Sequence, residues 1–336
     1  MKIRSLLAPA LAGLSLLCAA RAATITENFA ANPLQNGWQI FGDTNLFQWD
    51  STNHLLDVTW DSSQSNSYFY HPLGAILGTN DSFSMSFDLV LQDYAIGVNP
   101  GFPSDFPIST GLLNYGEATS ANFFRNGYPT QPDLAEFDFY QWDDVGAYPD
   151  TNTVWPVFVD SSNDFYYAGD SSYGVVELPV NIAMHVAMIY TAADETCVLS
   201  ITTNGVPVLP SIVVDLSEMG TNFGDYHLDA FAVESYSQVN SEPAGSILAH
   251  GTIANIVLTV PPPPVTLLQA ALTNGVAQVQ FASLTNWNYL LLSSPDLVTW
   301  SPNGPVAAGT GGNLILQDTN SIQSCQFYRV AALRTD

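Results

Sequence analysis

Basic residues are almost absent from this sequence of 336 residues. After residue 22 it contains no lysine and only three arginines, Arg125, Arg329 and Arg334, against 31 acidic residues, so that part carries a formal charge of −28. A surface of this sign repels nucleic acid and anionic lipid, and favours divalent cations, neutral polymers or cationic partners. We therefore expect no nucleic-acid partner. Solubility, or adaptation to a salty medium, is an alternative interpretation of the acids.

Cysteine is scarce as well. Beyond residue 22 only Cys197 and Cys325 remain, and they fall in two different predicted domains. A disulfide between them stays open, but we do not expect one, so a large core must hold the fold together. Hydrophobic residues make up 47% of the chain, which is enough to form such a core.

Motifs of the common catalytic and metal centres are missing. The sequence has no serine nucleophile elbow, no phosphate-binding loop and no setting for a cysteine nucleophile. The five histidines lack the i, i+2 or H-E-x-x-H spacing of metal ligands, so each is interpreted as a lone histidine. They are His54, His71, His185, His227 and His250.

The first 22 residues have the features of an export signal. Lys2 and Arg4 precede an apolar run, Leu6–Ala20, that is too short to span a membrane comfortably, and Ala20–Ala22 is a small-x-small cleavage site. We predict a signal peptide over residues 1–22 and an extracellular, periplasmic or cell-surface protein. No later stretch is long and apolar enough for a transmembrane segment.

A run of four prolines divides the rest of the chain. The sequence VPPPPV, Val260–Val265, cannot lie inside a sheet and favours a stiff linker. Residues 23–260 hold 28 acids and one base, whereas residues 265–336 hold three acids and two bases. We predict one domain at 23–260, a linker at 261–264 and a C-terminal module at 265–336.

Both parts alternate between apolar and polar residues, which is typical of β-strands. In the first part, many short strands separated by turns predict a large antiparallel sandwich or jelly roll. These strands are expected at Ser82–Leu91, His185–Thr191, Cys197–Gly205, Leu228–Tyr236 and Gly251–Val260. In the second part, a hairpin at Leu267–Ser283, a strand–turn–strand at Asn288–Trp300 and a last strand at Gln326–Leu333 predict a small immunoglobulin- or fibronectin-like sandwich.

Four segments of the first part carry a resemblance to a known family. Glu27–Asp43, Leu56–Gly74 and Ser82–Leu91 resemble the start of concanavalin A-like lectin and glucanase jelly rolls, and Gly245–Pro261 resembles their last strand, which returns beside the first. The resemblance implies an all-β, antiparallel jelly-roll fold, which lectins, laminin-G-like modules, glucanases and lyases share. The C-terminal YLLLSSPDLVTW and FYRV look like a small β-module at the ends of exported Verrucomicrobia-type proteins, which implies an accessory or anchoring role.

One strand, in DLAEFDFYQWDD (Asp133–Asp144), places Glu136 and Asp138 on the same face. Jelly-roll glycoside hydrolases carry E-x-D-x-E or E-x-D-x-x-E on such a strand, with the last glutamate as the proton donor. Tyr140 or Gln141 occupies that position here, and neither replaces a glutamate at neutral pH. We therefore predict no catalytic residue, and keep a hydrolase or lyase with a degenerate motif as an alternative.

The same strand suggests a binding surface. We predict a ligand-binding set that combines the two acids with two aromatic residues and the first domain's only cation: Arg125, Glu136, Asp138, Tyr140 and Trp142. Sugar rings stack on aromatic side chains, and their hydroxyls bond to acids and amides. The alternatives are core packing for the aromatic residues, an internal ion pair for the arginine, and half-exposed or cation-binding carboxylates for the acids.

Calcium is a further candidate. The segments Gln141–Asp150 and Val159–Asp170 supply Asp, Asn and Ser oxygens, although without the spacing of a calcium-binding loop. Taken together, the sequence predicts an exported, non-catalytic carbohydrate-binding or cell-surface protein whose partner is a polysaccharide or glycan. A glycoside hydrolase or polysaccharide lyase and a structural envelope or adhesion module remain the alternatives.

Overall fold

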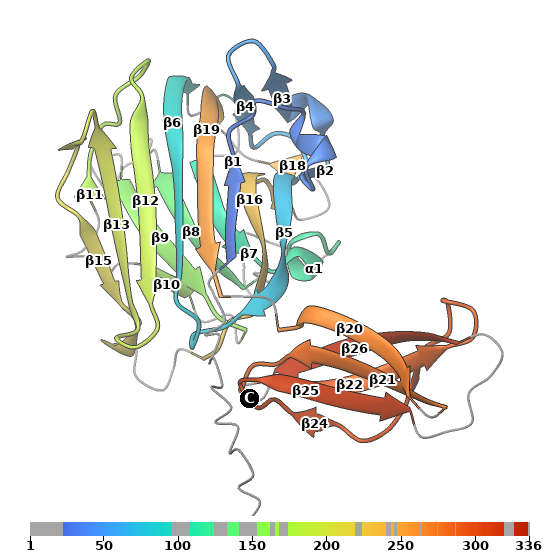
Figure 1. The fold of residues 1–336 in the computed structure, drawn as a ribbon. Coiled ribbons are helices and arrows are strands. Elements are labelled where there is room, and N and C mark those ends of the chain that lie inside the picture. Colours follow the sequence, from blue (N-terminus) through green and yellow to red (C-terminus); the bar gives the residue numbers. More distant parts are fainter. Residues whose placement is uncertain are drawn as a thin grey trace, which may run out of the picture. The chain divides into compact units, whose positions relative to one another are not determined.

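The protein is described by a computed structural model (Figure 1). The structure describes residues 23–95, 98, 108–121, 123, 133–140, 153–161, 165–167, 174–218, 224–239, 243–244, 247–261, 264–273, 275–285, 287–318 and 326–334. The chain forms two compact units, one of them Ala22–Pro261 and the other containing Pro262–Asp336. Among these residues almost every regular element is a strand, and all the strand pairs are antiparallel except one isolated bridge, so the predicted all-β, antiparallel fold class is confirmed.

The first unit contains a nine-stranded sheet, here called sheet A. Its order is β14-β13-β12-β6-β19-β4-β3, with β1 also paired to β19 and β15 to β13. The strands are β1 (Ala23–Glu27), β3 (Phe47–Asp50), β4 (Leu55–Asp61), β6 (Phe83–Ala95), β12 (Met184–Thr191), β13 (Thr196–Thr203), β14 (Val206–Pro207), β15 (Ile212–Asp215) and β19 (Leu248–Val260).

An eight-stranded sheet, sheet B, lies behind it. Its order is β10-β9-β8-β7-β16-β5-β2, with β11 paired to β9. The strands are β2 (Gln39–Phe41), β5 (Ser67–Leu77), β7 (Ile108–Leu113), β8 (Leu134–Tyr140), β9 (Thr153–Val159), β10 (Phe165–Tyr167), β11 (Gly174–Val175) and β16 (Leu228–Ser235). Smaller elements are the 3-10 turns η1 (Pro33–Gln35) and η2 (Thr44–Leu46), the helix α1 (Tyr115–Ala118), and the paired strands β17 (Gln238–Val239) and β18 (Pro243–Ala244).

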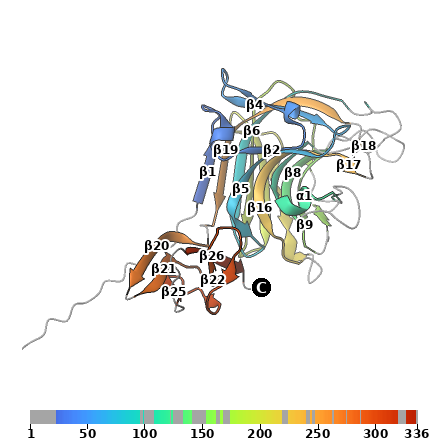
Figure 2. The ribbon, with the colours of Figure 1, turned by 90° about the vertical axis from the view of Figure 1, so that its right-hand side faces the viewer.

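The two sheets stack face to face, as Figure 2 shows from the side. Alternation produces this packing: along β6 the residues at odd positions from Phe83 to Leu91 are buried, and the residues between them are partly exposed. The first strand pairs with the last one, from Ala23↔Val260 to Glu27↔Ile256, which closes the sandwich as a jelly roll requires. Within the described residues no helix is long and apolar enough to cross a membrane.

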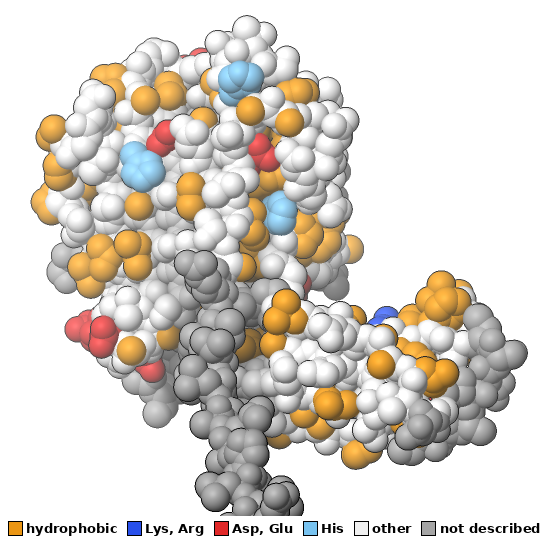
Figure 3. Space-filling view, in the orientation of Figure 1, with side chains coloured by type: hydrophobic (Ala, Val, Ile, Leu, Met, Phe, Trp, Pro, Cys, Tyr) orange, Lys and Arg blue, Asp and Glu red, His pale blue; other side chains and the backbone are white. Residues whose placement is uncertain are grey.

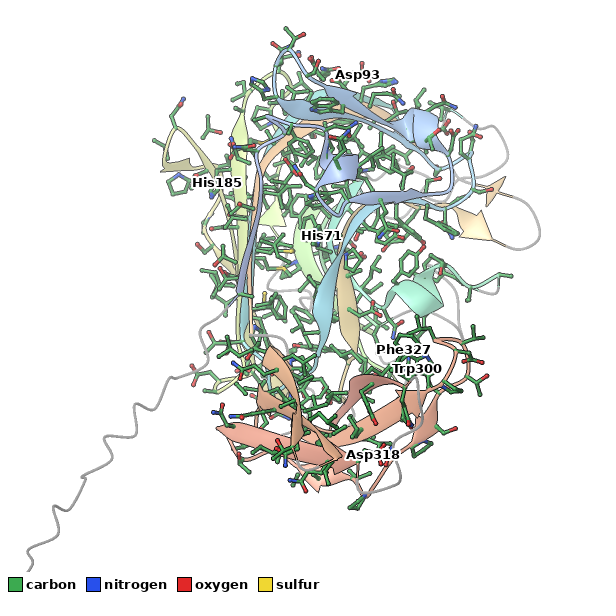
Figure 4. All side chains as sticks on the ribbon, turned by 45° about the vertical axis from the view of Figure 1, so that its right-hand side comes forward. His71, Asp93, His185, Trp300, Asp318 and Phe327 are labelled. Atoms are coloured by element: carbon green, nitrogen blue, oxygen red, sulfur yellow. The ribbon has the colours of Figure 1, made fainter. Side chains whose placement is uncertain are left out.

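The outer face of sheet A carries two separate His–Asp pairs. His185 Nδ1 lies 2.8 Å from Asp88 Oδ1, and His250 Nδ1 lies 2.7 Å from Asp93 Oδ1. Figure 3 shows histidine and acidic side chains spread over this face among neutral residues, and Figure 4 places His185 and Asp93 well apart. The histidines therefore do not converge on one site here.

Sheet B differs because its central strands are buried on both faces. On β8, Phe137 contacts Phe87 of sheet A at a ring-centroid distance of 5.9 Å, so Phe137 faces the core between the sheets. Alternation then directs Glu136 and Asp138 to the opposite face of sheet B, away from sheet A. Both are nevertheless 0% exposed. The expectation of half-exposed sheet-face acids is therefore wrong.

The second unit is a small sandwich of two sheets. One has the order β20-β21-β25, and in the other β22 pairs with β23, β24 and β26. The strands are β20 (Thr266–Thr273), β21 (Val276–Ala282), β22 (Trp287–Ser294), β23 (Ser301–Pro302), β24 (Ala307–Ala308), β25 (Asn313–Asp318) and β26 (Phe327–Arg334). Its core consists of Val279, Phe281, Trp287, Tyr289, Leu291 and Leu316.

One expected strand of this unit is wrong. Leu297–Trp300 forms a bend instead, because Asp296 Oδ1 accepts hydrogen bonds from the backbone N–H groups of Val298 (2.9 Å) and Thr299 (2.8 Å). These bonds curl the backbone around the carboxylate and leave it unavailable to a sheet. Of the two cysteines, Cys197 is free and buried, and Cys325 lies outside the described residues.

Candidate functional site

Three carboxylates occupy the face of sheet B that points away from sheet A. In the strand register Asp138 on β8 lies opposite Ser109 on β7, and Ser109 lies opposite Glu234 on β16. Glu136 lies two residues from Asp138 along β8, next to Gly111 of β7. Residues in register or two apart share a face, so Glu136, Asp138 and Glu234 lie on the same side of three adjacent strands. All three are 0% exposed.

Gly111 leaves the space that Glu136 occupies. A Cβ atom built on Gly111 would collide with the Cα and Cβ atoms of Glu136 and with the carbonyl oxygen of Ala135. Two of these three atoms belong to the backbone of β8, so a side-chain rotation cannot relieve the collision. Glycine at position 111 is therefore what allows β7 and β8 to approach each other beside Glu136.

Two hydroxyl groups fix the carboxylates of β8. Ser109 Oγ donates to Asp138 Oδ1 at 2.6 Å, and Tyr236 OH donates to Glu136 Oε2 at 2.8 Å. Hydrogen bonds from hydroxyl groups to carboxylates are short and strong, and they offset part of the cost of removing the acids from water. The two acids are thus held in defined positions rather than free to rotate.

Aromatic rings surround the carboxylates. Tyr236 packs edge-on against Tyr68 of β5 and also contacts Phe123, with both pairs of ring centroids 5.9 Å apart. Tyr68 lies opposite Glu234 in the register, and Trp155 of β9 lies opposite Asp138. Trp155 is partly exposed, whereas Tyr68 is fully buried. The row of side chains therefore runs from a partly open edge at Trp155 into a closed interior.

The helix α1 lies over the other end of this face, on the side away from sheet A (Figure 2). Tyr115 stacks on Tyr70 at 4.3 Å and meets the ring of Phe41 edge-on at 6.3 Å. Tyr68 OH donates to the carbonyl oxygen of Ala118 at 3.0 Å. Burial, and then the neighbouring Tyr115, raise the pKa of Tyr70 above its usual range, so its hydroxyl stays protonated.

Acidic residues hold α1 in this place. Asp229 Oδ1 accepts a hydrogen bond from the backbone N–H of Tyr115 at 2.8 Å, and Glu117 Oε2 accepts one from the backbone N–H of Asp133 at 3.1 Å. Asn114 caps the helix by accepting from the N–H of Glu117 at 3.2 Å. Burial raises the pKa of Asp229, an effect that its bond to Tyr115 opposes.

Asp133, next to this helix, is itself buried. Burial raises the pKa of Asp133 to about 6, although the hydroxyl of Ser161 and the backbone N–H of His227 both donate to its Oδ2 atom, at 2.8 and 2.7 Å, and lower it. Among the described residues, its Oδ1 atom has no hydrogen-bond partner. This carboxyl therefore changes charge in a mildly acidic range, unlike an ordinary aspartate.

The predicted binding residues fall into two groups. The structure brings Glu136 and Asp138 together, and Tyr140 follows them on β8, although its side chain is not described. Arg125 and Trp142 lie outside the described residues. So does Gln141–Asp150, one of the two proposed calcium segments, and within the part of the chain that is described no three His, Cys, Asp or Glu side chains form a metal-binding group.

Two residues of this face were missed in the sequence. Glu234 and Tyr236 lie in LDAFAVESY (Leu228–Tyr236), which was recognised only as an alternating strand. The available signal was an acid and a tyrosine at alternate positions, Glu234 and Tyr236, at the end of this strand. The position of Glu234 near β7 and β8, however, depends on the order of strands in the sheet, which brings together residues about a hundred positions apart. Alternation within one strand does not reveal that order.

Comparisons with known proteins find likenesses of structure alone. No family model matches the sequence, and no curated protein matches it. Similar solved structures include lectin II from Ulex europaeus, with 15% sequence identity and a TM-score of 0.45, covering 72% of this chain and 99% of that one. Peanut lectin with a nine-residue peptide has 16% identity and a TM-score of 0.42, covering 71% of this chain and 98% of that one. A lectin from Bauhinia forficata in complex with GalNAc has 12% identity and a TM-score of 0.43, covering 72% of this chain and 99% of that one.

Proposed function

We propose that the protein is an exported, non-catalytic carbohydrate-binding protein, and that its glycan contacts the face of sheet B that carries Glu136 and Asp138. The observation that supports this proposal is the set of three buried carboxylates on β8 and β16, bordered by aromatic rings. Carboxylate oxygens accept hydrogen bonds from sugar hydroxyls, and rings such as Trp155 offer a surface for the C–H face of a sugar.

A purely structural role explains these acids less well. A buried charge loses its hydration even when it has partners, and apolar residues of the same volume are often as stable or more stable in its place. Three fully buried acids on one face of sheet B therefore point to a ligand. The remaining proposed contacts are Arg125, Tyr140 and Trp142, and a calcium ion is a further part of the proposal.

Entry of a ligand requires movement. Since Glu136 and Asp138 are 0% exposed, a glycan reaches them only when the segments over the face shift. Trp155, Tyr115 and Phe41 are partly exposed and would make the first contacts.

A glycan array tests this function. Residues 23–336 are screened with and without calcium, beside the variant Glu136→Gln and the matched control Asp194→Asn, which removes an exposed turn acid of sheet A. We expect defined glycans to bind the wild type and the control, and the signal to fall with Glu136→Gln. An array without any signal, in calcium as well, contradicts carbohydrate binding.

A glycoside hydrolase is the second candidate, and the position of Glu234 favours it. Asp138 and Glu234 are separated by one intervening strand, which places their backbones roughly 9.6 Å apart at the usual strand spacing. Inverting glycosidases hold their two carboxyl groups about 6.5–9.5 Å apart, a separation that Asp138 and Glu234 would reach if their side chains lean slightly towards each other. Reducing-end release by the wild type that is lost in Glu234→Gln and in Asp138→Asn would establish this activity. No release from any array ligand would exclude it for those glycans.

The cellular location of the protein and the role of its C-terminal unit are also part of this proposal. Residues 1–22, which lie outside the described residues, would direct export to the periplasm, the cell surface or the medium. The C-terminal unit would be an immunoglobulin-like accessory or anchoring module. Mass spectrometry of the exported protein tests the cleavage, because an amino terminus at Ala23 is expected and an intact Met1 contradicts it.

A further inference from the structure

The first strand of the C-terminal unit is an exposed apolar edge. β20 begins the order β20-β21-β25, and seven of its eight residues are exposed. Leu267 is 76% exposed, Leu268 55% and Leu272 67%. Figure 1 shows β20 along one border of this unit. So much apolar surface on an edge strand is a feature of interaction sites.

The backbone of β20 is unprotected as well. Among the described residues it pairs with β21 alone, so its other side presents a row of N–H and C=O groups. Edge strands are usually shielded by charged residues or proline, and the sequence TLLQAALT has neither. One irregularity lies at its start, between Thr266 and Gln269, where Leu267 has a φ of 55°.

The apolar face of β20 continues the core of the module. Ala270 lies opposite Val279 and Leu272 opposite Ala277 in the register, and both of these β21 residues are buried. By alternation Leu268, Ala270 and Leu272 share that side of the sheet. The apolar side of the sheet thus continues onto β20, where these side chains are exposed. A further strand paired to the open edge of β20 would help to cover them.

We propose that the occupant of this edge is a second copy of the chain, with β20 paired antiparallel to β20 of its partner. The sequence is self-complementary in one register. With Ala270 opposite Ala270 of the other copy, Leu268 of each copy lies opposite Leu272 of the other. Such a pair has two-fold symmetry, as an isologous interface requires, and brings four leucines onto one face as cross-strand pairs.

The charge distribution favours this region for contact between two copies. Residues 23–260 carry 28 acids and one base, so two such units repel each other. Residues 265–336 carry three acids and two bases, and β20 carries no charge. Two chains with this composition approach with least repulsion through their C-terminal units, particularly at physiological salt, where charges are screened beyond about 8 Å.

Sedimentation equilibrium of residues 23–336 tests the pairing and its register together. The wild type should dimerise within roughly 1 μM to 1 mM, the range of modest interfaces. Leu268→Lys and Leu272→Glu should each weaken dimerisation by about 100-fold, a factor of ten at each of two symmetric positions. The double variant places lysine opposite glutamate across the dimer and should recover most of the affinity.

The controls separate this interface from general stickiness and from misfolding. Val298→Lys changes another exposed apolar residue of the same module, 83% exposed, and should leave the dimer unchanged. Far-UV circular dichroism and thermal unfolding should be the same for all variants, because the substituted side chains lie in solvent. A wild type that stays monomeric at 1 mM, or single variants that dimerise like the wild type, would overturn the proposal. A double variant weaker than both single variants would overturn the register.

Discussion

Replacing Gly111 with alanine is the sharpest test of how the carboxylate face is built. The added Cβ collides with backbone atoms of β8 and with the Cβ of Glu136, so β7 and β8 must separate. Inserting one methyl group into a packed region usually costs about 1–3 kcal/mol, and a collision with backbone belongs at the upper end. We expect Gly111→Ala to lower the free energy of unfolding by about 3 kcal/mol, and the melting temperature by roughly 6–12 °C for a unit of this size.

The assay is urea and thermal unfolding followed by tryptophan fluorescence and circular dichroism. Gly116→Ala in α1 is the matched control, because its added Cβ meets nothing closer than 3.5 Å and alanine favours a helix. We expect that control to be as stable as the wild type or more stable by up to about 1 kcal/mol. A Gly111→Ala protein as stable as the wild type would refute the described approach of β7 to Glu136.

Two further predictions concern the groups around this face. Tyr236→Phe removes the hydroxyl that donates to buried Glu136 Oε2, so it should destabilise the protein by about 1.5–3 kcal/mol. The control is Tyr328→Phe, which removes a partly exposed hydroxyl that donates to Asp318 and should cost less. Equal losses of stability in urea unfolding would contradict this prediction. Asp133 has a folded pKa of about 6 against 3.8 unfolded, so between pH 4 and 6 the folded state holds a proton that the unfolded state releases. Its contribution to the free energy of unfolding should therefore fall by up to about 3 kcal/mol as pH rises through this range. The variant Asp133→Asn should not show this fall. If the free energies of unfolding of the two proteins changed in parallel with pH, the prediction would be contradicted.

Alternation within single strands allowed much of the fold to be predicted. The pattern at Ser82–Leu91 became β6, and the pairing of the first strand with the last one agrees with the predicted jelly roll. The same rule correctly placed Glu136 and Asp138 on one face. These features depend on neighbours in sequence, which a period of two residues reveals directly.

Features that depend on distant neighbours could not be predicted. The burial of Glu136 and the space at Gly111 follow from the register of β7 against β8, and the place of Glu234 from the register of β7 against β16. The bend at Leu297–Trp300 followed another rule, since the bonds to Asp296 outweighed an apolar pattern that favoured a strand.

Isothermal titration calorimetry with the strongest array ligand tests most directly whether glycans contact the carboxylate face of sheet B. The ligand is titrated into the wild type, Asp138→Asn and the control Asp194→Asn, after unfolding curves have shown that all three are folded. We expect the control to bind like the wild type and Asp138→Asn to bind at least about tenfold more weakly, as the loss of one charged hydrogen bond predicts. An unchanged Kd for Asp138→Asn would contradict a binding site on this face.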